Sequence, residues 1–321
     1  MTAYNQTLNE VEYVSIEQLE TDYLVIGAGA MGMAFVDELL TRTKQTRFII
    51  VDRYLQPGGH WNTAYSFVHL HQPSAFYGVN SEKLEKHGGE FASKPELLSY
   101  YRLVLKKLLA TGRVTFLSEC EYYGDGCIRS LCEPNKEYRV QTRKKVVDAT
   151  YMQVEVPSTR PPHYEVSADA NLVPINALSS LERTYGGYVI IGAGKTGIDA
   201  VLYLLAQGVE PSTIRWVISR DVWYYDRENF SSNKMLDFQI DSSRCILDGE
   251  SVDGIFDAMG NQNLLLKLEP DIKPQVFRCA TITKSERDQV LKIGEFIRLG
   301  RVQKVGSKFI ELDDGSVPTS S

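Results

Sequence analysis

Two six-residue glycine patterns are the residues of this sequence best suited to chemistry. They are Gly27-Ala28-Gly29-Ala30-Met31-Gly32 and Gly192-Ala193-Gly194-Lys195-Thr196-Gly197. In each, the first glycine permits a tight turn, the second lets the backbone approach a ligand, and the third lets a helix pack closely on a strand. The N–H groups that begin such a helix bind phosphates, so the two patterns predict two nucleotides in one chain.

The first pattern lies in the context that a dinucleotide site needs. The apolar run 23–26 predicts a buried strand before it, residues 33–40 predict a helix after it, and residues 48–51 predict a second buried strand. Asp52 ends that strand 20 residues after Gly32, where an acid binds a ribose hydroxyl, and Arg53 follows it. This context favours nucleotide binding over the alternative, a glycine-rich turn without a ligand.

The second pattern has the same context. The apolar run 188–191 predicts a strand before it, and residues 198–207 predict a helix that Gly208 ends. Residues 214–218 predict the next strand. The residues predicted to line the second nucleotide are Gly192, Gly194, Lys195, Thr196, Gly197, Ser219 and Arg220.

The end of this strand predicts the type of nucleotide. Ser219 and Arg220 stand where the first copy has Asp52 and Arg53. An acid repels a ribose 2′-phosphate, whereas serine and arginine accommodate one, so the second nucleotide is predicted to be NADPH rather than NADH. The alternative for Arg220 is a solvated charge at a strand end. Lys195 either contacts a phosphate or points to solvent, and the sequence leaves both open.

The loop Gly58-Gly59-His60-Trp61 carries a resemblance to a known family. Two glycines allow the backbone to pass close to a ligand, and Trp61 offers a large flat surface. Directly after an acid-terminated second strand, the loop resembles the Gly-Gly-x-Trp motif of flavin-containing and Baeyer–Villiger monooxygenases. The resemblance implies that the first dinucleotide is FAD, with Gly59, His60 and Trp61 beside it.

The resemblance covers most of the chain and implies an α/β fold. It implies two Rossmann-like dinucleotide-binding domains with parallel sheets and a small antiparallel insertion. Residues 94–112 predict a helix, 114–117 and 138–142 predict strands of the insertion, and 145–150 predict a returning buried strand.

A proline-rich stretch predicts the domain boundary. Pro157, Pro161 and Pro162 make a stiff linker. We therefore expect an FAD-binding domain over residues 1–155 and an NADP-binding domain over residues 156–321.

The segment 65–78 follows the Gly-Gly-His-Trp loop and contains the candidate catalytic residues. In the resembling families this stretch runs past the flavin ring, which implies that His71 or Gln72 donates to a flavin hydroperoxide, or that His71 acts as an acid–base group. A packing or surface histidine is an equally open alternative. The aromatic run 223–225 either roofs the nicotinamide or packs in the core, and core packing is favoured.

The sequence departs from the resembling families at three places. Residues 171–178 lack their Phe-x-Gly-x-x-x-His fingerprint, and Tyr151 replaces a glycine. After the Asp-Asp-Gly turn at 313–315, the segment that closes the flavin domain in those families is expected to be missing, so that the chain is truncated or naturally minimal.

Three functional hypotheses follow. The first is an enzyme that reduces FAD with NADPH and oxygenates a small organic substrate with molecular oxygen. The second is a flavin reductase or dehydrogenase without oxygen transfer, which the missing fingerprint favours. The third is a truncated, non-catalytic nucleotide-binding protein.

Composition argues against other classes. A net charge of −6 lacks the basic footprint of a nucleic-acid-binding protein. The five cysteines form no C-x-x-C pair, which argues against a zinc site and a disulfide reductase, and no metal is expected. The sequence shows neither a secretory signal nor an apolar run of about 20 residues, so we expect a soluble, cytoplasmic protein without a transmembrane segment.

Overall fold

The computed structural model divides the chain into two compact units. It describes residues 14–86, 90–151, 158–183, 185–231 and 233–319. The first unit takes residues 1–62, 78–87 and 95–153, and the second takes residues 63–77, 88–94 and 154–321. The boundary expected between residues 155 and 156 lies outside the described residues. A single division there would leave residues 63–77 and 90–94 in the first half, whereas both segments belong to the second unit.

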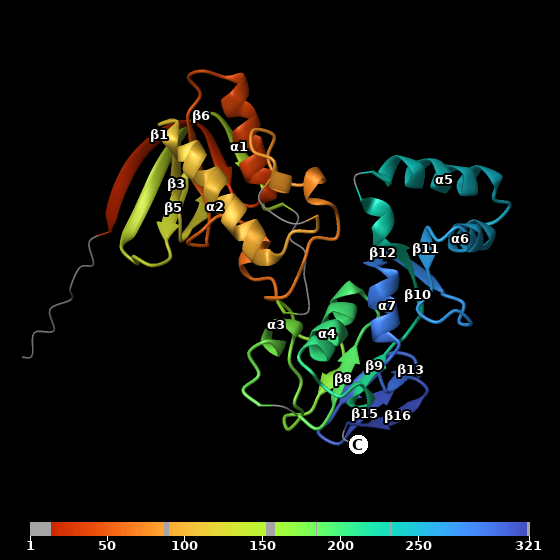
Figure 1. Cartoon of the computed structure of the whole chain (residues 1–321). Coiled ribbons are helices and arrows are strands. Elements are labelled where there is room, and N and C mark those ends of the chain that lie inside the picture. The colour runs from red at the N-terminus through yellow and green to blue at the C-terminus, as the bar shows by residue number, and fades with distance from the viewer. Residues whose placement is uncertain (1–13, 87–89, 152–157, 184, 232, 320–321) are drawn as a thin grey trace, which may run out of the picture. The chain divides into compact units, whose positions relative to one another are not determined.

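The first unit is built on a six-stranded sheet in the order β3-β2-β1-β6-β5-β4. Four strands run parallel, namely β1 (Ser15–Ile26), β2 (Phe48–Val51), β3 (Val114–Leu117) and β6 (Lys136–Asp148). Two further strands, β4 (Cys120–Gly124) and β5 (Cys127–Ser130), continue the sheet as an antiparallel ribbon beside β6. The helices of this unit are α1 (Ala30–Arg42) and α2 (Lys94–Ala110) (Figure 1).

Local patterns explain these elements. All four residues of β2 are buried, as a central parallel strand requires. The α1 helix buries Met33 and Val36 one turn apart, which matches the predicted apolar spacing. The α/β fold with a parallel sheet and a small antiparallel insertion is confirmed.

Two strand predictions in this unit are wrong. Residues 114–117 were expected in the antiparallel insertion, but β3 pairs parallel with β2 at the sheet edge. Residues 138–142 and 145–150 were expected as separate strands, but β6 is one strand along the whole of β1, and Val146 keeps 44% of its surface exposed. The basic run 143–145 separated the two predicted strands because charged residues are typical of loops, but in the structure their side chains are exposed on a continuous strand.

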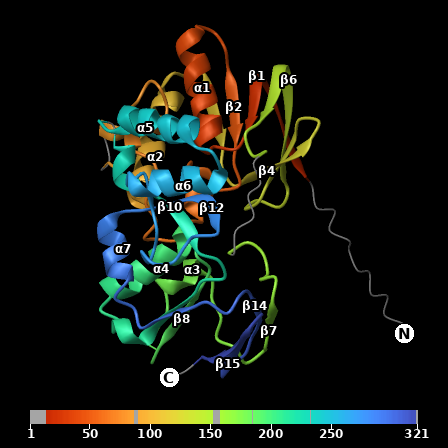
Figure 2. The ribbon, with the colours of Figure 1, turned by 90° about the vertical axis from the view of Figure 1, so that its right-hand side faces the viewer.

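The described residues of the second unit form three small sheets. The parallel sheet has the order β13-β9-β8, with β8 (Tyr188–Ile191), β9 (Ile214–Val217) and β13 (Glu295–Ile297). The second sheet comprises β10 (Val222–Asp226), β11 (Leu265–Leu266) and β12 (Val276–Ile282). The third comprises β7 (Glu165–Val166), β14 (Val302–Val305), β15 (Phe309–Leu312) and β16 (Gly315–Pro318) (Figure 2).

Five α-helices and several single turns complete the described elements. The helices are α3 (Ile175–Leu178), α4 (Lys195–Ala206), α5 (Met235–Asp248), α6 (Val252–Asn261) and α7 (Lys284–Val290). The 3₁₀ turns are Gly59–Asn62, Ser74–Phe76, Leu84–Lys86, Pro211–Thr213 and Arg227–Phe230. As predicted, α4 ends just before Gly208, which has a left-handed φ of 78°. Across the described helices, none joins the length and apolar content that crossing a membrane requires.

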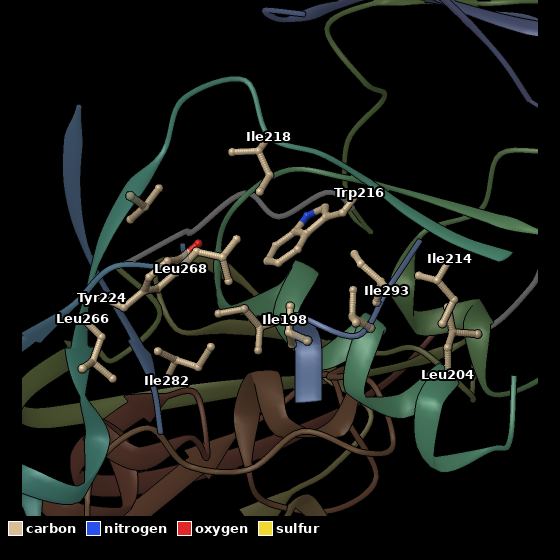
Figure 3. Close-up of a cluster of buried hydrophobic side chains, with 13 residues drawn as sticks. Ile198, Leu204, Ile214, Trp216, Ile218, Tyr224, Leu266, Leu268, Ile282 and Ile293 are labelled. Atoms are coloured by element: carbon tan, nitrogen blue, oxygen red, sulfur yellow. The ribbon is translucent and has the colours of Figure 1, made fainter. Parts of the chain in front are cut away.

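The core of the second unit surrounds Trp216 of β9, which has no exposed surface (Figure 3). Ile198 of α4, Tyr224 of β10 and Ile282 of β12 pack in the same cluster. Trp223 is buried in a neighbouring cluster. The favoured prediction for residues 223–225, core packing, is confirmed for both of these rings.

The C-terminal hairpin lies later than its sequence predicted. Residues 296–302 and 308–312 were expected to pair, but Phe296 belongs to β13 and pairs parallel with Trp216 of β9. β15 pairs antiparallel with β14, and on its other side with β16. The prediction was wrong for the first strand because its apolar residues fit a strand equally well beside β9 or beside β15, and the sequence pattern does not show which of the two it pairs with.

Candidate nucleotide sites

The first glycine pattern forms a tight turn between β1 and α1. Gly27 has φ 100°, and its N–H donates to the Val51 carbonyl across the sheet at 2.7 Å. A Cβ on Gly32 would collide with the Gly27 carbonyl oxygen, so only glycine fits there. Gly29 is the N-cap of α1, and no described side chain caps that end. The first N–H groups of α1 therefore remain available to an anion.

The Gly-Gly-His-Trp loop packs directly on this turn. Gly59 has φ 54°, and a Cβ placed on it would lie 2.9 Å from Gly29 Cα. The Gly58 N–H donates to the Ala28 carbonyl at 2.9 Å. Trp61 is buried, and its ring lies 4.9 Å from that of His60. Desolvation lowers the pKa of His60. The backbones of the first glycine turn and of the Gly-Gly-His-Trp loop, which are distant in the sequence, thus lie in direct contact.

Asp52 braces the first turn. Only 6% of this residue is exposed, and its carboxylate accepts from the Ala28 N–H at 2.6 Å and the Tyr54 N–H at 2.9 Å. Burial raises the pKa of Asp52 in spite of these two bonds. Arg53, in contrast, points to the surface and pairs with Glu121 at 2.7 Å. Asp52 therefore lies within the glycine turn, and Arg53 lies outside it.

The second glycine pattern repeats this geometry. Gly192 has φ 108° and donates to the Val217 carbonyl at 3.1 Å, and a Cβ on Gly197 would collide with the Gly192 carbonyl. Gly194 is the N-cap of α4, again without a cap from any described side chain. Apart from its two neighbours in the chain, no described residue has an atom within 4 Å of the place where a Cβ on Gly194 would be. The start of α4 thus also presents open N–H groups.

Core side chains hold the carbonyl groups of the second turn. The Trp216 indole donates to the Gly192 carbonyl and the Tyr224 hydroxyl donates to the Ala193 carbonyl, both at 2.8 Å. Burial raises the pKa of Tyr224, so it stays a donor. Because carbonyl oxygens that would repel an anion are engaged by the core, the turn presents donors to a ligand.

The sheet ladders align the two copies in three dimensions. Ile26 pairs with Val51 in the first unit, and Ile191 pairs with Val217 in the second. The residue equivalent to Asp52 is therefore Ile218, a core residue, rather than Ser219. Ser219 and Arg220 come one and two positions later, and neither bonds to another described residue. In the second unit, therefore, no carboxylate stands at the position equivalent to Asp52.

A chain of four charged residues runs beside the start of α4. Lys195 contacts Asp199 and lies 3.7 Å from Glu286, which also pairs with Arg227. Only 10% of the Lys195 side chain is exposed. Burial alone would raise the pKa of Glu286, but Lys195 and Arg227 together lower it. Lys195 therefore neither points to solvent nor reaches past the start of α4 in this structure.

Residues 63–77, which we call the strap, are tied to this charged chain and to the rest of the second unit. Tyr65 donates to Asp199 at 2.6 Å, and burial together with that carboxylate raises the pKa of Tyr65. The Phe67 ring stacks on Tyr203 with 4.1 Å between centroids. The strap thus belongs to the second unit through polar and aromatic contacts.

Comparison with known proteins finds relatives in sequence and in structure. No family model matches it. An uncharacterized protein of Mycobacterium tuberculosis is 42% identical over a match of 318 residues, and the match covers 94% of this chain and 58% of the relative. The uncharacterized oxidoreductase CzcO of Bacillus subtilis is 26% identical over 197 residues, 59% of this chain and 53% of that protein. The chain thus spans less than two thirds of the length of these relatives.

Solved structures give the fold. Open cyclohexanone monooxygenase matches with a TM-score of 0.58 and 14% identity, over 94% of this chain and 71% of that one. The OTEMO complex with FAD and NADP gives 0.54 and 13%, over 93% and 70%. A mutant flavin monooxygenase of Stenotrophomonas maltophilia gives 0.50 and 16%, over 94% and 76%. The chain has the flavin monooxygenase fold.

Within this fold the candidate catalytic residues His71 and Gln72 lie on the strap. The His71 Nδ1 atom is 3.4 Å from the Thr281 hydroxyl. Desolvation lowers the pKa of His71, and the charges of Lys195 and Arg227 act in the same direction. The Gln72 amide donates to the Phe76 carbonyl at 3.5 Å, at the edge of hydrogen-bond range. His71 therefore lies near the charged chain, and Gln72 makes a weak local contact.

Sequence reasoning missed Tyr65, Asp199, Arg227 and Glu286. Two local signals were present: Lys195 and Asp199 are four residues apart on one helix, and Thr283 with Glu286 forms a capping box at the start of α7. Neither signal shows that the two helices meet at one charge cluster. The described cysteines are all free thiols, and the described His, Cys, Asp and Glu side chains form no group suited to a metal.

Proposed function

We propose that this chain forms the nucleotide-binding part of an NADPH-dependent flavoprotein oxidoreductase. The first unit, over most of residues 1–155, binds FAD, and the second unit, over most of 156–321, binds NADPH. The observation that carries the proposal is the repeated turn, in which a helix start without a side-chain cap contains a glycine that leaves no room for a Cβ. The complex of OTEMO with FAD and NADP supports both cofactors.

The two sites differ in ways that favour different cofactors. At the first turn, Gly59 packs against Gly29, and the described residues show no such contact at the second turn. A flavin dinucleotide at the first turn would therefore contact two stretches of backbone that carry no side chains. We assign Gly27, Gly29, Gly32, Asp52 and Gly59 to FAD. At the second turn, Ile218 in the place of Asp52 leaves no carboxylate to repel a 2′-phosphate. Arg220, two positions later, then supplies the charge that recognises the phosphate.

The residues of the chain divide the work of a redox enzyme. The start of α4 and Arg220 hold the phosphates of NADPH, while the Gly58–Trp61 loop and the start of α1 hold those of FAD. A bound flavin supplies the redox chemistry by accepting electrons from the nicotinamide. His71 is the proposed acid–base group, and desolvation keeps it neutral so that its ring can accept a proton.

We propose oxygenation of a small organic substrate as the reaction, by the similarity to monooxygenases. A second candidate is a flavin reductase or dehydrogenase that transfers no oxygen atom. Residues 171–178, which lack the fingerprint of the resembling families and contain the short helix α3, favour this candidate.

A visible absorption spectrum tests the proposal. The purified protein is mixed with FAD, freed of unbound flavin, and titrated with NADPH without oxygen. Protein-bound flavin that bleaches is the expected result, and a protein that retains no flavin would contradict the proposal. Admitting air with a ketone or thioether then separates the candidates, because a monooxygenase yields oxygenated product and a reductase yields only peroxide.

A further inference from the structure

Lys195 stands at an unfavourable place for a cation. It is the first residue of α4, where the helix macrodipole places a partial positive charge. Its partner Asp199 lies four residues towards the C-terminus, the less favourable order for an ion pair on a helix. The side chain is nearly buried as well. Lys195 is held in this position by the carboxylates of Asp199 and Glu286.

Both carboxylates keep a second donor that does not depend on Lys195. The Tyr65 hydroxyl donates to Asp199 Oδ2 at 2.6 Å. Arg227 pairs with Glu286 Oε1, and the Thr283 N–H donates to Glu286 Oε2 at 2.8 Å. Removing one member of a buried ion pair is costly when the other charge is left uncompensated. Lys195 can leave this cluster without stranding either carboxylate.

We propose that Lys195 is an exchangeable ammonium group, which leaves Asp199 and Glu286 for a phosphate oxygen when a dinucleotide binds at the start of α4. The inference rests on the proposed nucleotide site of the second unit and names the residue that senses its occupancy. Tyr65 and Arg227 hold the two carboxylates while Lys195 is on the ligand. Because Tyr65 belongs to the strap, the exchange also changes the contacts of the segment that carries His71.

The exchange gives Asp199 an unusual sign of effect. In the free protein Asp199 competes with the nucleotide for Lys195, so neutralising Asp199 strengthens nucleotide binding. A merely structural Asp199 would act in the opposite direction, because its loss would loosen the start of α4. Removing the Tyr65 hydroxyl weakens binding, since Asp199 then lacks a donor once Lys195 has left.

Calorimetric titration with NADP⁺ tests the exchange in a double-mutant cycle of the full chain. We expect Asp199→Asn, which keeps the side-chain shape, to bind NADP⁺ about threefold to tenfold more tightly, and Lys195→Met to bind about tenfold more weakly. In the Lys195→Met background, Asp199→Asn should give no gain. Weaker or unchanged binding in Asp199→Asn overturns the exchange. A gain that persists without Lys195 also overturns it, because simple removal of a negative charge then explains the effect.

Tyr65→Phe provides a probe that changes no charge. We expect about threefold weaker NADP⁺ binding in the wild-type background and no change in Lys195→Met. The matched control is Ser66→Ala, whose contact with Ser179 at 2.9 Å lies outside the charged chain and which should bind NADP⁺ like the wild type. Equal effects of Tyr65→Phe in both backgrounds contradict the exchange. A wild-type protein that binds no NADP⁺ instead contradicts the proposed function itself.

Discussion

Asp52 and Ile218 occupy matching positions at the ends of β2 and β9, yet they have opposite chemistry. The Asp52 carboxylate accepts a hydrogen bond from the Ala28 N–H of the first turn, whereas Ile218 lies in the apolar core of the second unit. One turn is therefore braced by a carboxylate, and the other is braced by the hydrogen-bond donors Trp216 and Tyr224. This difference is what separates the two sites in our proposal.

Arg220 should decide between the two nicotinamide nucleotides. We expect Arg220→Gln to raise the Kd for NADPH about tenfold and to leave that for NADH unchanged, because only NADPH carries the 2′-phosphate. Fluorescence titration with each nucleotide measures this. Arg301→Gln removes an exposed charge elsewhere in the same unit and serves as the control. Equal losses for both nucleotides would mean that Arg220 contacts a shared group or none.

Glu286 should make the stability of the second unit depend on acid. Its pKa lies below the ordinary 4.5, so its ion pairs stabilise the fold above that pH and are lost as the pH falls through the lowered pKa. We expect Glu286→Gln to cost about 2–4 kcal/mol at neutral pH. The gap from the wild type should close below pH 4.5. Urea unfolding across this range tests the prediction, and a gap that stays constant would refute it.

At the scale of elements, the start of α4 leaves its backbone N–H groups open to a ligand, although the structure has room for a side chain at Gly194. Gly194 has φ −84°, which any residue adopts, and open space lies around it. Gly197, three residues later, has no room for a Cβ beside the Gly192 carbonyl. Function and folding therefore constrain different glycines of one motif.

Gly194→Ser should change stability and binding in opposite directions. A serine N-cap accepts from the first N–H groups of α4, so we expect unfolding free energy to rise by a few tenths of a kcal/mol. The same N–H groups are then no longer available to a phosphate, and NADPH affinity should fall about tenfold. Thermal unfolding and nucleotide titration of one preparation measure both. Gly197→Ala, the contrasting variant, should destabilise the unit, and a Gly194→Ser protein with normal affinity would argue against phosphate binding at α4.

The sequence predicted those elements whose signals are local. The two turns follow from glycine at fixed spacing between an apolar run and a helix, and β2 and β8 were predicted with their observed bounds. The continuity of β6 was not predicted, because the basic run 143–145 hides it and only pairing with β1 reveals it. The match of Ile218 rather than Ser219 to Asp52 likewise required the sheet ladder.

At the scale of the whole chain, the charged residues beside α4 and their donor Tyr65 could not be predicted together, because they come from four separate stretches. Tyr65 lies on the strap, Asp199 on α4, Arg227 after β10 and Glu286 on α7. Each has an ordinary surface role in its own sequence context. Only the packing of the second unit brings the four together, and with them the candidate site around Lys195.

The strap should contribute measurably to the stability of the second unit. We expect Phe67→Ala, which removes the stacking on Tyr203, to lower the unfolding free energy by about 2 kcal/mol. Phe76→Ala is a matched control on the same segment, because Phe76 is 55% exposed, and it should cost less than about 0.5 kcal/mol. Chemical unfolding of both variants compares them. Equal costs would show that the strap contributes little through Phe67.

The strap also sets a schedule for synthesis. Tyr65 leaves the ribosome 134 residues before its partner Asp199, and His71 precedes Thr281 by 210 residues. At a translation rate of about 5–20 residues per second, Tyr65 and Phe67 wait on the order of ten seconds for the helix that covers them. During that interval the aromatic side chains of the strap lack their packing partners and are exposed in the nascent chain. A chaperone that shields this segment early in translation would raise the yield of folded protein more than one that acts after release.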